Sequence, residues 1–380
     1  MSTSCADEAK STKVTIDALV VGKQYRLAQK DKERTLLPLF REKVRQSIKH
    51  SPNMCLFYKR MGLDPDRIEG LADIPPLPVT MFKLFDLITC DKASVVRVLK
   101  SSATTTGVPS KIHLDKTTAF RQSRALVSIL TEFIGNQRRP LLVIDTEQVN
   151  DPKATTLSAR GAAIRGIENF AKSSTYVLKG LDDLLLDRDA LAGFMKANEG
   201  KEVLIYGFTY ILWTRFLEVL EKEGSQLDLT GSKVLHSGGW KKLKDRKVEK
   251  SVFNDRIGAL FRTSPNNVID FYGMVEQVGV IFPDCEEGRK HVPDFAEVVI
   301  RDPVTMDEVG PGVPGLIEVM SVLPNSYPGE AVLTEDLGRL VGLDDCPCGR
   351  KGKCFEFLER VEKAELRGCG DTFAERSGDR

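Results

Sequence analysis

Apolar residues at helical spacing mark the first well-defined segment of the chain. In LLPLFREKVRQSIKH they recur three or four positions apart, as on one face of an amphipathic helix. These residues are Leu36, Leu37, Phe40, Val44 and Ile48. The helix is expected to end near Ser51-Pro52. The ADIPPLPVT stretch further on is predicted to be extended, because a proline excludes the helical region for the residue before it, and to lead into a short helix or turn over 81–87.

Further along, short apolar runs alternate with amphipathic segments. Strands are predicted at 111–115, 141–145, 203–207, 233–236 and 268–271. A helix capped by Thr117 or Thr118 is expected to run to about Ile134, and another to cover 210–223. This alternation indicates an α/β fold with layered, largely parallel sheets. After Asp284, short strands separated by Gly and Pro turns predict a small antiparallel barrel or sheet on the main body.

Composition narrows the class of protein. The 380 residues are 41% hydrophobic, which is enough for a sizeable core. The 55 Lys+Arg nearly balance the 54 Asp+Glu, so the chain has no excess of positive charge that would attract nucleic acid or an anionic membrane. Residues 1–12 are polar and small and are predicted to be disordered. The chain has no secretory h-region and no apolar run of about 18 residues, so we expect a cytoplasmic protein without a membrane span. In the reducing cytoplasm, the eight cysteines are expected to be thiols, metal ligands or a nucleophile rather than disulfides.

The segment KSSATTTGVPSK, residues 100–111, is the first candidate site. It joins two strand-like runs and is rich in hydroxyl groups, which together with backbone N–H groups can surround a phosphate chain. The candidate nucleotide-binding residues are Ser101, Ser102, Thr104, Thr105, Thr106, Gly107 and Lys111. The segment lacks the G-x-x-x-x-G-K-[ST] spacing of P-loop NTPases. Taken alone, it is equally compatible with a Ser/Thr-rich turn between two strands.

Three motifs in order resemble those of the adenylate-forming enzymes, which include acyl-CoA synthetases, luciferases and nonribosomal adenylation domains. Residues 100–111 resemble the family's S-S/T-S-G-T-T-G-x-P-x-K loop, FYGMVE (271–276) its aromatic-Gly-x-T/x-E motif, and LTEDLGR (333–339) its T-G-D-L-G-R motif. Ala103 and Thr104 depart from the usual Ser and Gly of the loop. A side chain at Thr104 can crowd the approach of phosphate to the backbone.

Within this superfamily, the chain from about Asp73 onward most resembles the acyl-protein synthetases of the bacterial bioluminescence fatty-acid reductase system. The matching stretches are DIPPLPVTMFK (73–83), the loop at 100–111, SGGWKK (237–242), RKHVP (289–293), VPGLIEVMSVLPNSYP (313–328), TEDLG (334–338) and ERVEKAELRGC (359–369). Some of these stretches are peculiar to that family.

The resemblance implies roles for the later motifs. Glu276 matches the family's Mg²⁺ ligand, a role that suits a hard carboxylate beside a triphosphate, and Asp336 matches the carboxylate that accepts both ribose hydroxyls. Tyr272, followed by Gly273, is expected to stack on adenine, and Arg360 stands at the family's hinge. The alternatives are a solvated glutamate on a strand end and a tyrosine buried in an α/β core.

The glycines of SGGWKK follow a predicted strand, where they would let a ligand approach the backbone. Gly238 and Gly239 are therefore candidates for the wall beside the adenine or the substrate carboxylate. Lys241 is a candidate for stabilising charge on the carboxylate and α-phosphate, but it also fits a surface position in the basic run KKLKDRK. His236 either orients the acyl carboxylate or is simply hydrogen-bonded.

The resemblance also predicts the domain organisation. An α/β adenylation core is expected over 13–284, a β-rich subdomain over 285–360, and a hinge and tail over 361–380. The family's mobile C-terminal domain of about 100 residues, with its catalytic lysine, does not fit in such a short tail.

Cys369, in RGCGD, aligns with the cysteine that accepts the acyl group as a thioester; flanking glycines and nearby Arg367 would favour an accessible thiolate. Without the resemblance, Cys369 would be interpreted as an unreactive cysteine in the C-terminal tail.

A second set of cysteines has the composition of a metal site. Cys285 and His291 have C-x5-H spacing, and Cys346 and Cys348 form C-P-C. Three thiolates and one imidazole suit a structural Zn²⁺ site, and the pattern resembles phenylacetate-CoA ligase-like members of the superfamily. The alternatives are free loop thiols, or a site in which Cys354 replaces one ligand.

Together these motifs predict an ATP-dependent acyl-protein synthetase. It would activate a carboxylic acid, by resemblance a fatty acid, as acyl-AMP and transfer the acyl group to Cys369. The resemblance implies a reductase partner that takes the acyl group. Two alternatives remain: an acyl- or aryl-CoA ligase in which coenzyme A is the acceptor, and a non-catalytic scaffold that keeps the fold.

Overall fold

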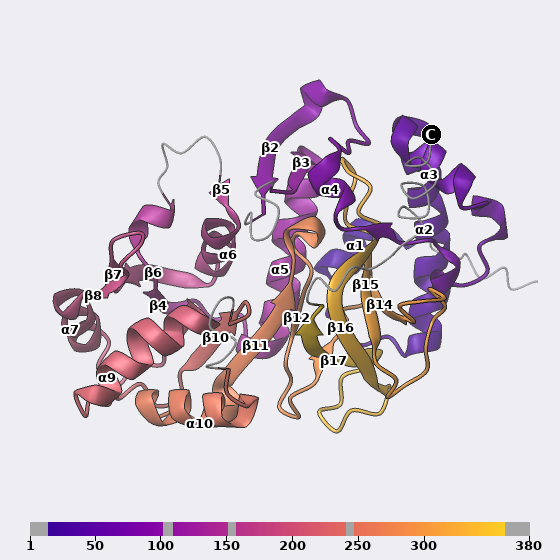
Figure 1. Ribbon diagram of the computed structural model, residues 1–380. Coiled ribbons are helices and arrows are strands. Elements are labelled where there is room, and N and C mark those ends of the chain that lie inside the picture. The colour runs from indigo at the N-terminus through magenta and orange to yellow at the C-terminus, as the bar shows by residue number, and fades with distance from the viewer. Residues whose placement is uncertain (1–13, 102–108, 151–156, 241–246, 362–380) are drawn as a thin grey trace, which may run out of the picture.

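Two large sheets and the helices packed on them make up the protein (Figure 1). The structure is a computed structural model that describes residues 14–101, 109–150, 157–240 and 247–361. The α-helices are α1 (Ile16–Val21), α2 (Gln29–His50), α3 (Pro52–Arg60), α4 (Met81–Leu84), α5 (Lys116–Ile134), α6 (Ala159–Glu168), α7 (Arg188–Ala197), α8 (Thr209–Ile211), α9 (Glu218–Lys222) and α10 (Lys250–Phe261). Within these ranges, each helix is either too short or too polar to cross a membrane.

The first sheet, which we call the α/β sheet, has the strand order β12-β11-β10-β9-β4-β6. Its strands are β4 (Arg139–Ile144), β6 (Ala171–Tyr176), β9 (Leu204–Phe208), β10 (Lys233–Ser237), β11 (Val268–Gly273) and β12 (Ile281–Pro283). Neighbouring strands are parallel except for β12, which runs antiparallel to β11. The predicted parallel α/β layer is therefore present.

Both faces of the α/β sheet are buried, as expected for parallel strands. Alternate residues of β9 enter different cores: Tyr206 packs in the core that includes α5 and α6, and Ile205 in the core that includes α7, α9 and α10. Between α8 and α9, residues Leu212–Leu217 form a π-helical turn. The predicted helix over 210–223 is thus present with an irregular centre.

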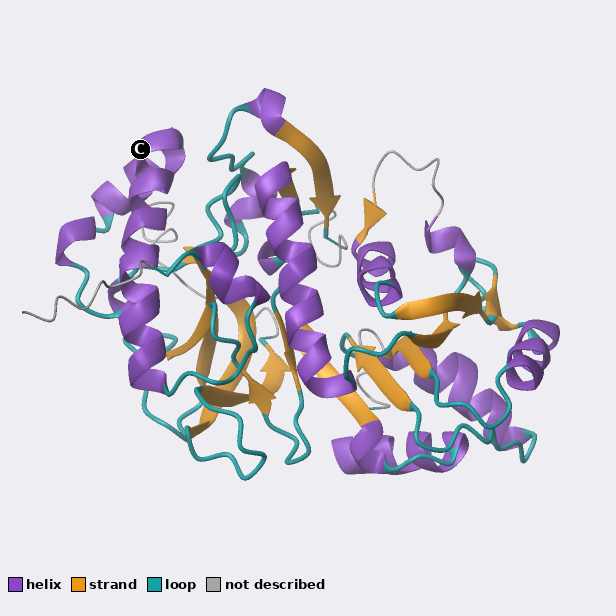
Figure 2. Cartoon of the chain, turned by 180° about the vertical axis from the view of Figure 1, so that it is seen from behind, coloured by secondary structure: helices purple, strands orange, loops and turns teal. Residues whose placement is uncertain are grey.

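The second sheet, which we call the antiparallel sheet, has the order β13-β17-β16-β15-β14, with β1 added in parallel to β16. Its strands are β1 (Leu77–Pro78), β13 (Lys290–His291), β14 (Ala296–Arg301), β15 (Gly315–Ser321), β16 (Ala331–Leu343) and β17 (Lys353–Arg360). This is the β-rich layer predicted for the C-terminal part of the chain. It lies beside α2 and α3, and α5 runs between it and the α/β sheet (Figure 2).

A smaller sheet carries the candidate phosphate loop. In it β3 (Lys111–Asp115) pairs with β2 (Val95–Lys100), which in turn pairs with β5 (Leu157–Ser158). A separate pair joins β7 (Leu178–Lys179) to β8 (Leu185–Leu186). The strand predicted at 111–115 has the observed bounds. The helix behind it is capped by Asp115, whose carboxylate accepts the Thr118 N–H at 2.7 Å, so the predicted threonine cap is wrong by two or three positions.

Candidate functional site

The two large sheets meet at a buried carboxylate. Asp336, on β16, is 5% exposed; its Oδ2 accepts a hydrogen bond from Tyr272 Oη at 2.8 Å and its Oδ1 one from Arg360 Nε at 2.9 Å. Tyr272 lies near the end of β11 and Arg360 at the end of β17. The structure thus brings three of the sequence-predicted nucleotide-binding residues into contact from three different strands.

The Tyr272 side chain is held both by its ring and by its hydroxyl. The ring stacks on Phe357 with centroids 5.7 Å apart and meets the edge of Phe355 at 6.1 Å. Burial, and after it the negative charge of Asp336, raises the pKa of Tyr272, so the phenol stays protonated and donates its hydrogen bond. Phe357 was not among the predicted site residues, because only the pairing of β16 with β17 brings it to the site.

Glu276 lies in the short helix η8 (Val275–Gln277), directly after β11, and is 5% exposed. Burial raises the pKa of this carboxyl, while the Ser110 hydroxyl, Lys83 and Arg360 act in the opposite direction. Ser110 is the residue immediately before β3. The carboxylate predicted to bind Mg²⁺ therefore lies at the base of the candidate phosphate loop.

The base of that loop is closed by two hydrogen bonds. The Ser101 N–H donates to the Ser110 carbonyl at 3.1 Å, and the Ser110 N–H donates to Ser101 Oγ at 2.8 Å. Lys111 is half exposed, and its Nζ lies 3.5 Å from Asp86 Oδ1. The predicted loop residues Ser102, Thr104, Thr105, Thr106 and Gly107 lie outside the described ranges, as do Lys241 and Cys369.

A connection before β16, which we call the 325–329 loop, ties the phosphate-loop strand β3 to η8. On one side Ser326 Oγ donates to the His113 carbonyl at 2.7 Å and accepts the Asp115 N–H at 3.1 Å. On the other side the Gln277 side-chain amide donates to the Gly329 carbonyl at 2.6 Å. The loop therefore fixes the spacing between the end of the phosphate loop and Glu276. Sequence reasoning missed this role, although PNSYP was one of the stretches that carried the family resemblance.

The predicted glycine turn follows β10. Gly238 has φ +83°, a conformation that side chains rarely adopt, and an added Cβ would lie 3.1 Å from Phe208. Gly239 is exposed, and an added Cβ would meet no atom of the described part of the chain within 4 Å. Trp240 packs edge-on against Trp213 at 5.5 Å. Two residues without side chains thus lie at the carboxyl ends of parallel strands, where α/β folds place their ligands.

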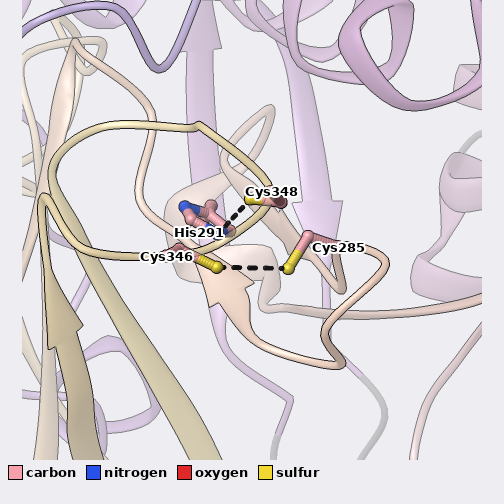
Figure 3. Close-up of side chains that lie close together, drawn as sticks. All are labelled: Cys285, His291, Cys346 and Cys348. Atoms are coloured by element: carbon pink, nitrogen blue, oxygen red, sulfur yellow. Dashed lines mark hydrogen bonds between the residues drawn. The ribbon is translucent and has the colours of Figure 1, made fainter.

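The four predicted metal ligands come together as a second, separate centre (Figure 3). Cys285 lies between β12 and β13, His291 in β13, and Cys346 and Cys348 in the connection from β16 to β17. Their candidate ligand atoms all lie within 4.8 Å of one another, with Cys285 Sγ 3.8 Å from Cys346 Sγ and Cys348 Sγ 3.3 Å from His291 Nε2.

The chemistry of these donors fits a zinc ion. Burial lowers the pKa of His291 to about 4, so the ring is neutral and can offer a nitrogen lone pair. Burial raises the pKa of Cys285 to about 12, so without a cation this sulfur resists ionisation. Three soft sulfurs and one imidazole match a closed tetrahedral Zn²⁺ site. Cys354 is buried nearby on β17 but does not belong to this group of four.

Comparison with known proteins gives a family match over nearly the whole chain. The family model described as "Acyl-protein synthetase, LuxE" matches residues 2–377. A long-chain-fatty-acid–luciferin-component ligase of Vibrio harveyi is 25% identical over 322 residues, covering 82% of this chain and 80% of that protein. A protein of the same name from Aliivibrio fischeri is 23% identical over 319 residues, covering 81% of this chain and 80% of that protein.

Solved structures with a similar fold include 2-hydroxyisobutyryl-CoA ligase. Its open conformation, in complex with 2-HIB-AMP and CoA, superposes with a TM-score of 0.66 at 15% identity, covering 89% of this chain and 76% of that one. Its thioesterification state gives a TM-score of 0.65 at 16% identity, covering 90% and 70%. At this identity the likeness concerns the fold, which agrees with the predicted adenylate-forming architecture.

Proposed function

Because the chain belongs to the acyl-protein synthetase family, LuxE, we propose that this ligase uses ATP to activate a long-chain fatty acid as acyl-AMP. The substrate class comes from its relatives, both of which are named long-chain-fatty-acid ligases. The observation that carries the proposal is the convergence of Tyr272, Asp336 and Arg360 in one hydrogen-bonded group, with Glu276 nearby at the base of the phosphate loop.

In this proposal Asp336 holds the ribose. An ionised carboxylate has about four lone-pair sites, and Tyr272 and Arg360 use one on each oxygen. One site on each oxygen is then free to accept a ribose hydroxyl. Tyr272 and Arg360 keep the carboxylate in a fixed orientation before the nucleotide binds, which reduces the entropy lost on binding. The Tyr272 ring is the candidate stacking surface for adenine.

The phosphates are proposed to lie between the 101–111 loop and Glu276, with Lys111 and Lys241 as sources of positive charge. Glu276 would hold Mg²⁺, which supplies neutralisation of phosphate charge when bound. The fatty-acid carboxylate oxygen attacks the α-phosphorus and pyrophosphate leaves, so the acyl-AMP forms without an added oxidant or reductant. The open backbone of Gly238 and Gly239 forms the wall beside the reacting groups.

We propose further that Cys369 is the acyl acceptor. The thiolate sulfur attacks the acyl carbonyl carbon, the bond to the AMP phosphate oxygen breaks, and AMP leaves with the electron pair. The thioester then passes to an acyl-reductase partner. The Cys285, His291, Cys346 and Cys348 centre is proposed to bind a structural Zn²⁺ that joins the β12–β13 connection to the β16–β17 connection.

Pyrophosphate release tests the activation step. Purified protein is incubated with ATP, Mg²⁺ and saturated fatty acids of graded chain length, and pyrophosphate is measured with and without acid. Release that depends on a long-chain acid supports the proposal, and Asp336→Ala should greatly reduce it at a fixed ATP concentration. Absence of acid-dependent release with every acid would contradict it and favour a non-catalytic role. Equal turnover of coenzyme A by wild type and Cys369→Ser would favour a CoA ligase.

A further inference from the structure

His236 is a buried polar residue beside the glycine turn, and the proposed chemistry has not used it. It lies on β10, one residue before the strand ends at Ser237, and is 4% exposed. Its Nδ1 lies 2.9 Å from the hydroxyl of Thr209, the residue that begins α8 directly after β9. The same hydroxyl donates to the Ser237 carbonyl at 3.2 Å. Thr209 thus bridges His236 to the first residue of the turn.

We assign the ring proton of His236 to Nδ1. In this assignment the Thr209 hydroxyl donates its single hydrogen to the Ser237 carbonyl, and its oxygen accepts from Nδ1–H. Asp270 Oδ1, a second acceptor, lies 3.7 Å from the same Nδ1. His236 Nε2 is then a buried acceptor without a hydrogen-bond partner among the residues placed by the structure. The ring is therefore held from the Nδ1 side.

The opposite end of the turn is reached through an aromatic contact. The His236 ring lies 4.5 Å from the ring of Phe253, on α10. Phe253 packs edge-on against Trp240, with centroids 6.2 Å apart. His236 is therefore linked to both ends of the segment 237–240. Thr209 links it to Ser237, and Phe253 links it to Trp240. Gly238 and Gly239 lie between these two ends.

Burial keeps the His236 ring neutral, and the charged groups near it are paired with one another. Asp270 is paired with Lys290 at 2.7 Å, and Lys290 also lies 3.4 Å from Asp284, which Lys250 contacts at 2.6 Å. Burial lowers the pKa of His236 to about 4, against the smaller opposing effect of Asp270. A neutral ring whose Nδ1–H is fixed keeps one hydrogen-bond pattern across the neutral pH range.

We propose that His236 is a positioning residue for acyl-adenylate formation, which fixes the 237–240 turn so that the Gly238 and Gly239 backbone keeps its place against the substrate. The inference rests on the proposed function. It assigns His236 a role through Thr209 and Phe253, without contact between its ring and the substrate. Phe253 packs against the ring and holds its tilt, and the Thr209 hydroxyl joins Nδ1 of His236 to the Ser237 carbonyl of the turn.

Side chains that replace one ring nitrogen at a time test the assignment. Asn places an amide N–H near the Nδ1 position, whereas Gln places it near Nε2, and Leu supplies neither. We expect His236→Asn to keep kcat/KM for acid-dependent pyrophosphate release within about threefold of wild type, and His236→Gln and His236→Leu to lose roughly tenfold, as for loss of a buried hydrogen bond and the strain that follows. The loss should appear as a raised KM for the acid or for ATP.

Thr209 gives a second pair of variants that does not alter the ring. Thr209→Ser keeps the bridging hydroxyl and should behave as wild type; Thr209→Val removes it at nearly equal volume and should match His236→Gln. The double variant His236→Gln/Thr209→Val should be no worse than either single variant, because all three break the same bridge. Thermal unfolding of each variant distinguishes loss of the Thr209 bridge from misfolding. Misfolding would lower kcat and leave the KM values unchanged.

Three results would overturn the inference. One is wild-type KM values in both His236→Leu and Thr209→Val. Another is equal loss in His236→Asn and His236→Gln, which would mean that Nδ1 has no special role. The third is additive loss in the double variant. A wild-type chain that releases no pyrophosphate with any acid would instead overturn the proposed function, and this inference with it.

Discussion

Tyr272 and Asp336 lie 64 residues apart in the sequence, yet the tyrosine hydroxyl donates a 2.8 Å hydrogen bond to the aspartate Oδ2. The bond joins the end of a strand in the α/β sheet to the middle of a strand in the antiparallel sheet. Burial of the Asp336 carboxylate makes the bond costly to lose, because a buried acceptor without its donor is poorly solvated. The proposed nucleotide site therefore depends on how the two sheets are held together.

This contact predicts graded effects on ATP binding. Tyr272→Phe removes one donor and should raise the KM for ATP about fivefold, as for a buried hydrogen bond worth roughly 1 kcal/mol. Asp336→Ala removes the proposed ribose acceptor and should raise it far more. Tyr176→Phe is the matched control, because Tyr176 donates a 2.9 Å hydrogen bond to Glu168 and lies on β6, the strand of the α/β sheet farthest from β11. It should lower stability and leave the KM unchanged; equal KM effects of the two tyrosine variants would contradict the assignment.

Glu276 predicts opposite effects on activity and stability. Burial raises the pKa of its carboxyl, so folding favours the neutral form, and the resulting stability is present below the unfolded pKa and is lost as pH rises through the folded pKa. Glu276→Gln keeps the side chain neutral. At pH 7.5 it should therefore melt at a higher temperature than wild type, and this gain should vanish at acid pH.

The same variant should lose Mg²⁺-dependent activity. In wild type, the Mg²⁺ concentration for half-maximal rate should increase as pH falls toward the raised pKa of Glu276, because only the ionised carboxylate binds the cation. Exposed Glu199 provides the control through Glu199→Gln. A Glu276→Gln protein with the Mg²⁺ dependence of wild type would show that this carboxylate is not a ligand.

Ser326→Ala should weaken the site at a distance. The change leaves the His113 carbonyl and the Asp115 N–H without their Ser326 partner, at a cost of about 1–3 kcal/mol in the free energy of unfolding. Because the 325–329 loop links β3 to η8, the KM for ATP should rise as well. Ser232→Ala is the comparison, since Ser232 Oγ accepts the Val203 N–H at 2.9 Å away from the site. If both variants lose stability alike with no change in KM, the loop does not set the spacing.

The cysteine and histidine centre predicts one zinc ion per chain. Elemental analysis of purified protein should find it, and Cys285→Ser or Cys346→Ser should remove it and lower the melting temperature, since a structural zinc site contributes directly to folding. Exposed Cys55 is the matched control through Cys55→Ser. Full stability of a metal-free wild type after chelation would argue against a structural ion.

The sequence predicted local structure best where a repeating pattern or a motif was complete. The strand at 111–115 and the helix end at Ile134 agree with the structure because each has its own apolar pattern. The helix cap was misplaced because Asp115 ends the strand and caps the helix at once. The π-helical turn at 212–217 was missed because the apolar spacing around it resembles that of an ordinary helix.

The contacts that unite the site were harder to predict. The Ser326 and Thr118 hydroxyls lie 3.0 Å apart although 208 residues separate them, and no periodicity links such positions. The four residues of the metal centre were identified from their residue types, from the C-x5-H and C-P-C spacing and from the family resemblance, and the structure brings them together. For His236 the sequence left two roles open, orienting the acyl carboxylate or an ordinary hydrogen bond, because its partner Thr209 belongs to a different strand-helix junction.

Intact-protein mass tests the central claim, acyl transfer from acyl-AMP to Cys369, most directly. Each of three proteins, wild type, Cys369→Ser and Cys55→Ser, is incubated with ATP, Mg²⁺ and a long-chain fatty acid. Its mass is measured before and after treatment with hydroxylamine. The account predicts a hydroxylamine-labile gain of one acyl group in wild type and Cys55→Ser, and none in Cys369→Ser. An adduct that persists in Cys369→Ser, or pyrophosphate release without any adduct, would contradict it.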